Sequence, residues 1–227
     1  MSRLIKYFFI SFAVIAPTCA AQDSMRVNSY NTVLKTPPPT VISLLPPDTS
    51  GGKPLMRCLK ERKTSRSFDS EPLPAQVLSN LLWAAFGVNR PDGRRTAPSA
   101  MNMQEMDIYV AMQKGLYLYD APSHTLKQVT GEDIREKTGT QSFVKDAPLD
   151  IVYVADLSKT GRASANDQIL YTAADCGFIA QNVYLYCASE GLACVVRASI
   201  DKPALSKAMD LRPDQKIILS QTVGYPK

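Results

Sequence analysis

Residues 149–155, with the sequence Leu-Asp-Ile-Val-Tyr-Val-Ala, form a short and almost uninterrupted apolar run. Runs of this kind are typical of strands that are buried on both faces of a sheet, so this segment is predicted to be a central strand. Strands and helices follow one another without regular βαβ units, which predicts an α+β fold rather than a doubly wound one. The other predicted strands are 107–112, 116–119, 193–196 and 216–225, and the predicted helices are 54–62, 74–86, 173–189 and 203–209, with a short helix at best over 132–138.

The predicted helix 173–189 is apolar around much of its circumference, which is typical of a core helix, and Gly191 is expected to end it. If Cys176 and Cys187 share this helix, they lie about 16 Å apart along its axis. A disulfide requires Cα atoms within about 7 Å, so this pair is excluded. The pairing of the remaining cysteines, Cys58 and Cys194 included, stays open.

The first 21 residues have the pattern of a secretory signal peptide. Arg3 and Lys6 precede an apolar run over 7–15, and small residues follow over 18–21. We therefore expect an exported protein, most simply a periplasmic one, cleaved after residue 20 or 21. A lipid anchor through Cys19 is the weaker alternative, because residues 16–18 are a poor approach to a lipobox.

Residues 22–52 are predicted to be an extended arm that precedes a single domain over 53–227. Prolines at 37–39 and 46–47 and the glycine pair 51–52 exclude a helix or a central strand. The arm is either a flexible linker or a segment that lies across a partner subunit. The apolar residues 41–45 indicate that part of the arm packs against a folded surface.

The charge of the chain is mild. Removal of residues 1–21 takes away two cations and no anion, which lowers the formal charge from +5 to +3. Nucleic-acid binding usually needs a concentrated basic stripe, so no nucleic-acid partner is expected, whereas a small anionic ligand is compatible. A single histidine and the absence of a C-x-x-C motif argue against a metal site.

Two segments carry side chains suited to ligand binding. Residues 62–67 combine three cations with three hydroxyls, which suits a phosphate, although a solvated basic helix end is an equally ordinary interpretation. Residues 96–104 form a loop of small residues whose Asn and Gln amides suit the edge of a planar heterocycle, or an ordinary connection. The adjacent amides Gln181 and Asn182 in the apolar helix must find partners or lie on its polar edge.

The usual nucleotide and hydrolase motifs are missing. The chain contains neither G-x-G-x-x-G nor a P-loop. A Ser-His-Asp triad would have to use His124, which we instead expect to be a solvated histidine in a turn.

Four motifs in order resemble the nitroreductase family. Residues 62–66 (Arg-Lys-Thr-Ser-Arg) resemble its R-R-S-x-R opening, and residues 98–104 (Pro-Ser-Ala-Met-Asn-Met-Gln) resemble its P-S-A-x-N-x-Q loop. Two further motifs complete the pattern over residues 53–227. They are the helix over 177–185 followed by Gly191-Leu192, and the closing Val-Gly-Tyr-Pro at 223–226. Segments 81–88 and 115–120 resemble the thiazoline-oxidase-like (SagB/ThcOx) branch, but the Lys-Tyr pair of that branch is not found before the long helix.

The resemblance implies an FMN-dependent oxidoreductase with a mixed or antiparallel sheet surrounded by helices, in a homodimer with FMN at the interface. No catalytic side chain is implied, because the cofactor carries the redox chemistry. Arg62 would bind the FMN phosphate, Lys63 and Thr64 would contact the cofactor, and Arg66 would lie near the flavin pyrimidine. The other cofactor-binding residues implied are Pro98, Ser99, Ala100 and Asn102 from the other subunit, Arg197, Ala198 and Ser199 near flavin N5, and Lys227 at the phosphate.

The function implied is ping-pong electron transfer through flavin to a small organic substrate. The donor is NAD(P)H, as for many relatives, or an envelope reductant such as a quinol, which suits an exported enzyme better. A specialised dehydrogenase or oxidase and a non-catalytic flavin-binding protein are the alternatives.

Overall fold

The computed structural model describes residues 40–227, and its centre is a seven-stranded antiparallel sheet. The predicted signal peptide, residues 1–21, and the arm residues 22–39 lie outside the described residues. The strand order is β1-β4-β3-β2-β5-β7-β6. The strands are β1 (Val41–Ser43), β2 (Met106–Met112), β3 (Gly115–Asp120), β4 (Thr125–Thr130), β5 (Leu149–Asp156), β6 (Ala193–Arg197) and β7 (Gln215–Gly224).

Strand β5 is the predicted central strand, and the structure confirms it. All of its residues are buried, and it pairs with β2 on one side and β7 on the other. Successive side chains of a strand point to opposite faces, so Ile151 and Tyr153 enter one core cluster whereas Val152 and Val154 enter a second. Both faces of the sheet are therefore covered.

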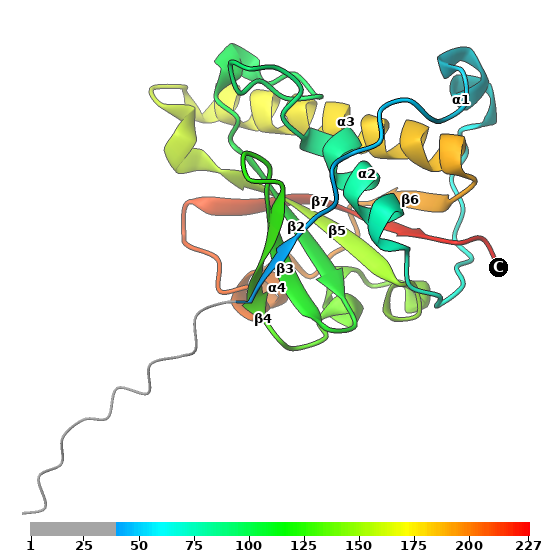
Figure 1. Ribbon diagram of the computed structural model, residues 1–227. Helices are drawn as coiled ribbons and strands as arrows, with labels where there is room; N and C mark the ends of the chain where they lie inside the picture. Colours follow the sequence, from blue (N-terminus) through cyan, green and yellow to red (C-terminus); the bar gives the residue numbers. More distant parts are fainter. Residues whose placement is uncertain (1–39) are drawn as a thin grey trace, which may run out of the picture. The chain divides into compact units, whose positions relative to one another are not determined.

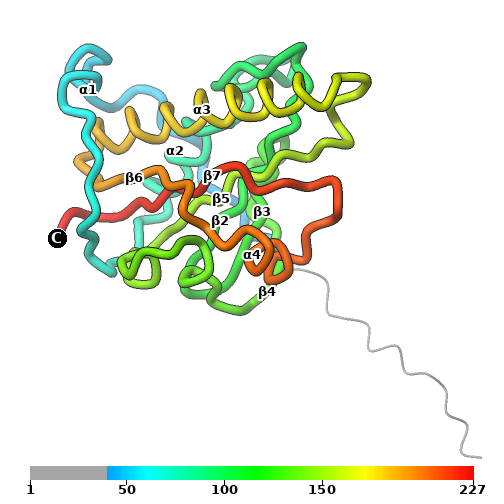
Figure 2. The backbone as a smooth tube through the Cα atoms, turned by 180° about the vertical axis from the view of Figure 1, so that it is seen from behind, coloured from blue at the N-terminus to red at the C-terminus, as the bar shows by residue number. Residues whose placement is uncertain are grey.

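Four α-helices cover these faces within the described residues: α1 (Leu55–Glu61), α2 (Ala75–Phe86), α3 (Ala165–Glu190) and α4 (Lys202–Ala208). Helices α2 and α3 lie on one side of the sheet and α4 on the other (Figures 1 and 2). All four were predicted, and the short helix expected over 132–138 is a 3-10 turn, Arg135–Thr138. The α+β prediction is confirmed.

Helix α3 begins eight residues earlier than the apolar pattern indicates. Ser164 caps its first turn: its hydroxyl accepts a hydrogen bond from Asp167 N and donates one to Asp167 Oδ2. This reciprocal arrangement stabilises a polar first turn, so the helix extends beyond its apolar part. Gly191 ends α3 in the left-handed conformation with φ of 74°, as predicted.

The prediction that α3 is a core helix is wrong for one of its faces. Cys176, Ile179 and Val183 pack in the core, but three large apolar side chains of the same helix are exposed. These are Ile169, Leu170 and Phe178, which are exposed by 70%, 63% and 47%. Part of the apolar pattern around the circumference therefore belongs to side chains that residues 40–227 leave uncovered.

The described part of the arm lies along its own chain. Strand β1 pairs with β4 at the sheet edge, and Asp48 N donates to Asn80 Oδ1 of α2 over 2.9 Å. Docking of residues 41–45 is thus confirmed, whereas the expectation that the arm crosses to another subunit is wrong for residues 40–50. Neither β1 nor β4 was predicted, because β4 buries only Leu126 and so lacks a clear apolar pattern.

The four cysteines within residues 40–227, Cys58, Cys176, Cys187 and Cys194, are buried free thiols. Cys176 and Cys187 share α3, which confirms the argument against their pairing. None of the helices within residues 40–227 has both the length and the apolar character needed to cross a membrane.

Candidate functional site

Tyr184 of α3 gathers two of the predicted site segments around its hydroxyl. Thr64 Oγ1 lies 3.2 Å from the Tyr184 hydroxyl, which also accepts a hydrogen bond from Val196 N over 2.9 Å. The guanidinium of Arg62 lies 5.3 Å from the centre of the same ring. Ser65 N donates to Cys194 O of β6 over 2.9 Å. The segment 62–66 is therefore held against α3 and β6.

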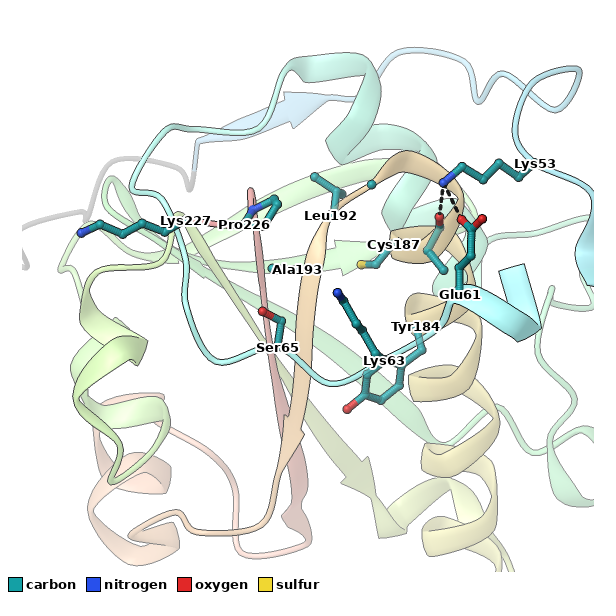
Figure 3. Close-up of a pocket in the computed structure, with 12 residues that line it drawn as sticks. Lys53, Glu61, Lys63, Ser65, Tyr184, Cys187, Leu192, Ala193, Pro226 and Lys227 are labelled. Atoms are coloured by element: carbon teal, nitrogen blue, oxygen red, sulfur yellow. Dashed lines mark hydrogen bonds and ion pairs between the residues drawn. The ribbon is translucent and has the colours of Figure 1, made fainter. Parts of the chain in front are cut away.

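A hollow of about 570 Å³ opens beside this segment (Figure 3). Lys63 and Ser65 line it together with Cys187 and Leu192. The amino group of Lys53 is committed to Glu61 Oε2 over 2.9 Å and to Ala188 O over 3.0 Å. Lys63 makes no hydrogen bond or ion pair within residues 40–227. The hollow thus offers an available cation and hydroxyl groups, a donor set that fits a phosphate.

Lys227, the last residue, also lines this hollow, and the pairing of Pro226 with Phe68 fixes its backbone there. Its side chain extends away from Lys63 and Cys187 (Figure 3). Lys227 also lines a second, polar hollow with Lys145 and Arg135. The predicted phosphate contact through Lys227 would therefore need a different side-chain conformation.

Arg197 is close to the site in sequence but directs its side chain into the protein. Its guanidinium donates to Asp150 Oδ1 and Thr222 Oγ1, each over 2.8 Å, and to Thr138 O over 2.9 Å. The Arg197 side chain is only 3% exposed. Ala198 and Ser199 follow it at the exposed end of β6. A role for this segment must therefore come from the backbone at 198–199, not from the arginine side chain.

The second predicted segment, 98–104, is a loop with an unusual backbone. Met101, Asn102 and Gln104 have φ values of 49°, 56° and 49°, in the left-handed region that costs a non-glycine residue of order 1 kcal/mol or more. Three bonds hold this conformation: Ala100 N donates to Asp175 Oδ2 over 2.8 Å, Gln104 N to Ser99 Oγ over 3.0 Å, and Arg95 Nε to Gln104 Oε1 over 2.8 Å. The loop is thus a fixed element that exposes Met101 and Asn102.

The two predicted binding segments do not meet within one chain. The loop 98–104 is anchored at Asp175 and the segment 62–66 at Tyr184, both on α3. Nine residues of helix separate these anchors by about 14 Å along the axis. The structure therefore brings 62–66 against β6 at Cys194 and Val196, the strand that 197–199 ends, and leaves Pro98, Ser99, Ala100 and Asn102 apart from it.

A buried carboxyl lies directly behind the loop. Glu105 is completely buried, and neither of its carboxyl oxygens has a hydrogen-bond partner within residues 40–227. Burial, with a smaller contribution from the negative charge of Asp175, raises the pKa of Glu105 to about 7. Unpaired buried carboxyl groups are costly, so Glu105 is a protonated acid over much of the acidic pH range.

The expectation of a solvated His124 is wrong. Its Nε2 lies 2.7 Å from Ser79 Oγ and 3.0 Å from Leu45 O, and its Nδ1 lies 2.9 Å from the Tyr119 hydroxyl. Burial lowers the pKa of His124, opposed by the hydrogen bond to Leu45. Ser79 is completely buried, so its hydroxyl is inaccessible to a substrate. The cluster fastens the arm to α2 and is not a hydrolase triad.

Sequence reasoning missed the two α3 residues that organise the site, Tyr184 and Asp175. Both are polar groups on the buried face of an apolar helix, where each must find a partner. The same rule was applied only to Gln181 and Asn182, which lie exposed and half-buried in the structure. Lys53, whose amino group lies at the hollow, was missed as well, because a single lysine just after the arm gives no signal of its position.

Comparisons with known proteins agree on one family. The model of the nitroreductase family matches residues 59–225. A nitroreductase homologue of Methanocaldococcus jannaschii is 31% identical over 147 residues, which cover 60% of this chain and 74% of the homologue. A crystal structure of a nitroreductase homologue from Ralstonia eutropha JMP134 superposes with a TM-score of 0.79 at 44% identity, over 84% of this chain and 93% of that one. The NADPH:FMN oxidoreductase of Vibrio harveyi, in complex with NAD⁺, shares the fold with a TM-score of 0.59 at 17% identity, over 76% of this chain and 69% of that one.

Proposed function

Because the chain belongs to the nitroreductase family, we propose that it is an FMN-dependent oxidoreductase that transfers electrons to a small organic substrate. The observation that carries this proposal is the hollow beside residues 62–66, where cations and hydroxyls are fixed against Tyr184 and β6. The NADPH:FMN oxidoreductase that shares the fold supports FMN as the flavin.

The residues present fit the phosphate of FMN. Lys63 and Ser65 supply a cation and a hydroxyl at the hollow. Arg62 and Thr64 lie against Tyr184, which also lines the hollow, and supply a second cation and hydroxyl beside it. Arginine matches phosphate oxygens with two parallel hydrogen bonds. Bound FMN would supply the two-electron redox chemistry. Arg66 would place its positive charge near the flavin pyrimidine, and the backbone at Ala198 and Ser199 would approach N5. The Arg197 side chain would support this backbone from inside the sheet.

We propose that the working form is a homodimer in which the loop 98–104 of one subunit completes the flavin site of the other. Two observations support it. The loop and the segment 62–66 are anchored about 14 Å apart on α3, and α3 exposes the large apolar side chains of Ile169, Leu170 and Phe178. A second copy would cover these side chains. A monomer at micromolar concentration in light scattering would contradict the dimer.

The proposed cycle has two half-reactions at one site. A donor delivers electrons and leaves, and the substrate then takes them. We propose export to the periplasm through the signal pattern of residues 1–21, with a lipid anchor at Cys19 as the lesser alternative. An exported enzyme does not meet the cytoplasmic NAD(P)H pool, so a quinol or a small redox protein is the donor we propose. Intact-mass analysis of the secreted form would test both the cleavage and the anchor.

The segments 81–88 and 115–120 resemble the thiazoline-oxidase-like branch, so a specialised dehydrogenase is the second candidate that we propose. In this case an organic reductant gives turnover with oxygen as acceptor, whereas nitroaromatic compounds do not. A protein that stays colourless after refolding with excess FMN would contradict both enzymatic functions.

The decisive experiment is the visible spectrum of residues 22–227 during anaerobic titration with NADPH and then dithionite. Flavin bands that bleach only with dithionite support the flavoprotein with an envelope donor. Flavin bands that bleach with NADPH support a nitroreductase-type cycle and contradict the proposed donor. In parallel, Arg62→Ala and Arg66→Ala should lose FMN, whereas Arg94→Ala, at an exposed arginine paired only with Asp92, should keep it.

A further inference from the structure

A further hollow lies beside the loop 98–104. Its volume is about 400 Å³, which falls within the range of small-molecule sites. Met101 and Met103 of the loop line it together with Tyr171 of α3 and Arg162 of the preceding turn. Two methionines and an aromatic ring make surfaces that suit a flat apolar ligand.

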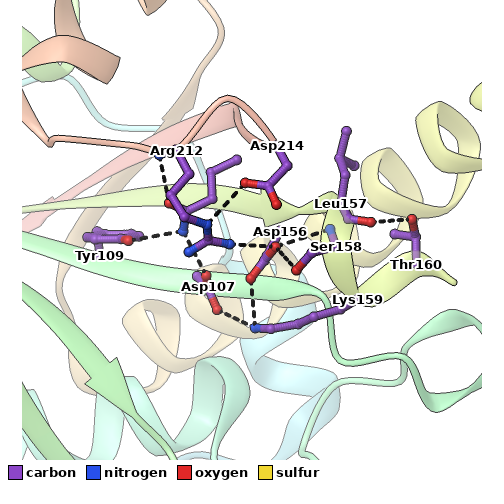
Figure 4. A network of polar contacts seen from close by, with 10 residues as sticks. Asp107, Tyr109, Asp156, Leu157, Ser158, Lys159, Thr160, Arg212 and Asp214 are labelled. Atoms are coloured by element: carbon purple, nitrogen blue, oxygen red, sulfur yellow. Dashed lines mark hydrogen bonds and ion pairs between the residues drawn. The ribbon is translucent and has the colours of Figure 1, made fainter.

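The hollow contains one available positive charge. Arg162 is exposed and makes no hydrogen bond or ion pair within residues 40–227. Lys159 also lines the hollow, but it is committed to Asp107 Oδ1 over 2.7 Å and lies 3.8 Å from Asp156 Oδ2 (Figure 4). The acid in the lining, Asp167, lies in the first turn of α3 and accepts a hydrogen bond from the hydroxyl of the cap residue Ser164.

The wall formed by the loop is rigid. Met101 is 73% exposed although its φ is 49°, and the bonds from Ala100 to Asp175 and from Gln104 to Ser99 hold the turn on both sides of it. A long apolar side chain kept exposed on a strained and braced turn is a feature of ligand contacts rather than of random loops. The flexible thioether adapts to the ring that it contacts.

We propose that this hollow binds a planar aromatic carboxylate, with the ring between Met101 and Tyr171 and the carboxylate on Arg162. This ligand is the small organic substrate of the proposed reaction, because the proposed dimer places the same loop at the flavin site of the partner subunit. The inference therefore rests on the proposed function for the role of the ligand, but not for its binding. Arginine favours a carboxylate through paired hydrogen bonds, and a neutral analogue of the same shape lacks that contact.

Binding is tested first without turnover. Protein labelled with ¹³C at the methionine methyl groups is titrated with benzoate, and Met101→Leu and Met103→Leu assign the two signals. We expect both signals to shift and saturate. Arg162→Gln should weaken the affinity about tenfold, which corresponds to the loss of ~1.4 kcal/mol. Lys207→Gln, which removes an equally exposed charge on α4, should not change it.

The role as substrate is tested by reoxidation of the dithionite-reduced protein with 4-nitrobenzoate or 4-nitrobenzyl alcohol. Each acceptor takes two electrons and two protons as its nitro group becomes nitroso and releases water. Arg162→Gln should raise the half-saturating concentration of the carboxylate about tenfold and leave that of the alcohol unchanged.

The outcomes separate the two proposals. A protein that binds flavin but shows no methyl shift with benzoate overturns this inference and leaves the proposed function standing. The proposed function is overturned, and the binding site supported, by a different pair of results. In that case the protein binds no flavin, but benzoate shifts the methyl signals of the wild type and binds more weakly to Arg162→Gln. Equal effects of Arg162→Gln on the carboxylate and the alcohol overturn the assignment of the carboxylate to this arginine.

Discussion

The carboxylate of Asp175 accepts a hydrogen bond from the backbone N–H of Ala100 over 2.8 Å, across 75 positions of the sequence. This contact fixes the strained loop 98–104 to the middle of α3, and it decides which way Met101 and Asn102 face. A helix residue thereby sets the geometry of a loop that the proposed function places at a flavin.

Loss of this anchor should release the loop. Asp175→Ala leaves the Ala100 N–H without its partner, which costs about 1–3 kcal/mol of unfolding free energy when the group stays buried. We expect faster amide hydrogen exchange over 98–104, measured by mass spectrometry. Asp175→Asn keeps an acceptor oxygen and should retain most of the protection, and equal exchange in all three proteins would argue that the loop is held by its other bonds alone.

Glu105 should make the stability of the protein fall between acidic and neutral pH. Its pKa is raised to about 7 in the folded state, above an unfolded value near 4.3. The folded state therefore binds more protons between these two values, so the contribution of Glu105 to stability is full below the unfolded pKa, is lost as pH rises through the folded pKa, and stays constant above it. The whole loss amounts to about 4 kcal/mol.

Replacement of Glu105 tests this sign directly. Glu105→Gln replaces the ionisable carboxyl with a neutral amide. In urea unfolding, the variant protein should therefore be more stable than the wild type at pH 9 and nearly as stable as the wild type at pH 5. Parallel curves for the two proteins between pH 5 and 9 would show that Glu105 titrates normally.

The hydroxyl of Tyr184 should matter for both stability and flavin. Tyr184→Phe removes its bonds to Thr64 and to Val196 N, which costs about 1–3 kcal/mol because the Val196 N–H loses its partner. We also expect weaker FMN binding in a fluorescence titration, since the segment 62–66 loses its anchor. Tyr186→Phe removes a hydroxyl bonded to Val77 O on the far side of the site and should leave the FMN affinity unchanged.

The buried pair of Arg197 and Asp150 should be strongly destabilised by removal of one partner. Arg197→Met leaves the completely buried Asp150 without its cation, for which about 3–5 kcal/mol is typical. The double variant Arg197→Met with Asp150→Leu should recover much of this loss in urea unfolding. If the double variant is no more stable than the single one, the hydrogen bonds from the arginine to Thr138 and Thr222 account for the loss of stability.

The fold was largely predictable because local patterns carried it. The apolar run 149–155 identified the central strand, and helical spacing with proline and glycine boundaries identified α1, α2 and α4. The edge strand β1 and its neighbour β4 were not predictable, since strands that bury few side chains have no period to detect. The start of α3 was missed because its first turns are held by the Ser164 cap and not by an apolar face.

The binding residues divide in the same way. Motif order identified Arg62–Arg66 and the loop 98–104, because a phosphate and a planar ring demand particular side chains in sequence. Other features of the site depend on groups that lie 25 to 120 positions away along the chain. These features are the burial of Arg197, the anchoring contacts of Tyr184 and Asp175, and the hydrogen bonds of His124. Contacts at such separation leave no local signal.

The sequence by itself therefore determined the family, the central strand and the chemistry of the ligand-binding segments, because these depend on residue type and short-range spacing. Only the tertiary structure decided that the arm residues 40–50 lie on their own chain, that α3 exposes large apolar side chains, and that the two binding segments are anchored apart. These properties depend on which surfaces remain uncovered after the chain has packed, and packing is a property of the whole chain.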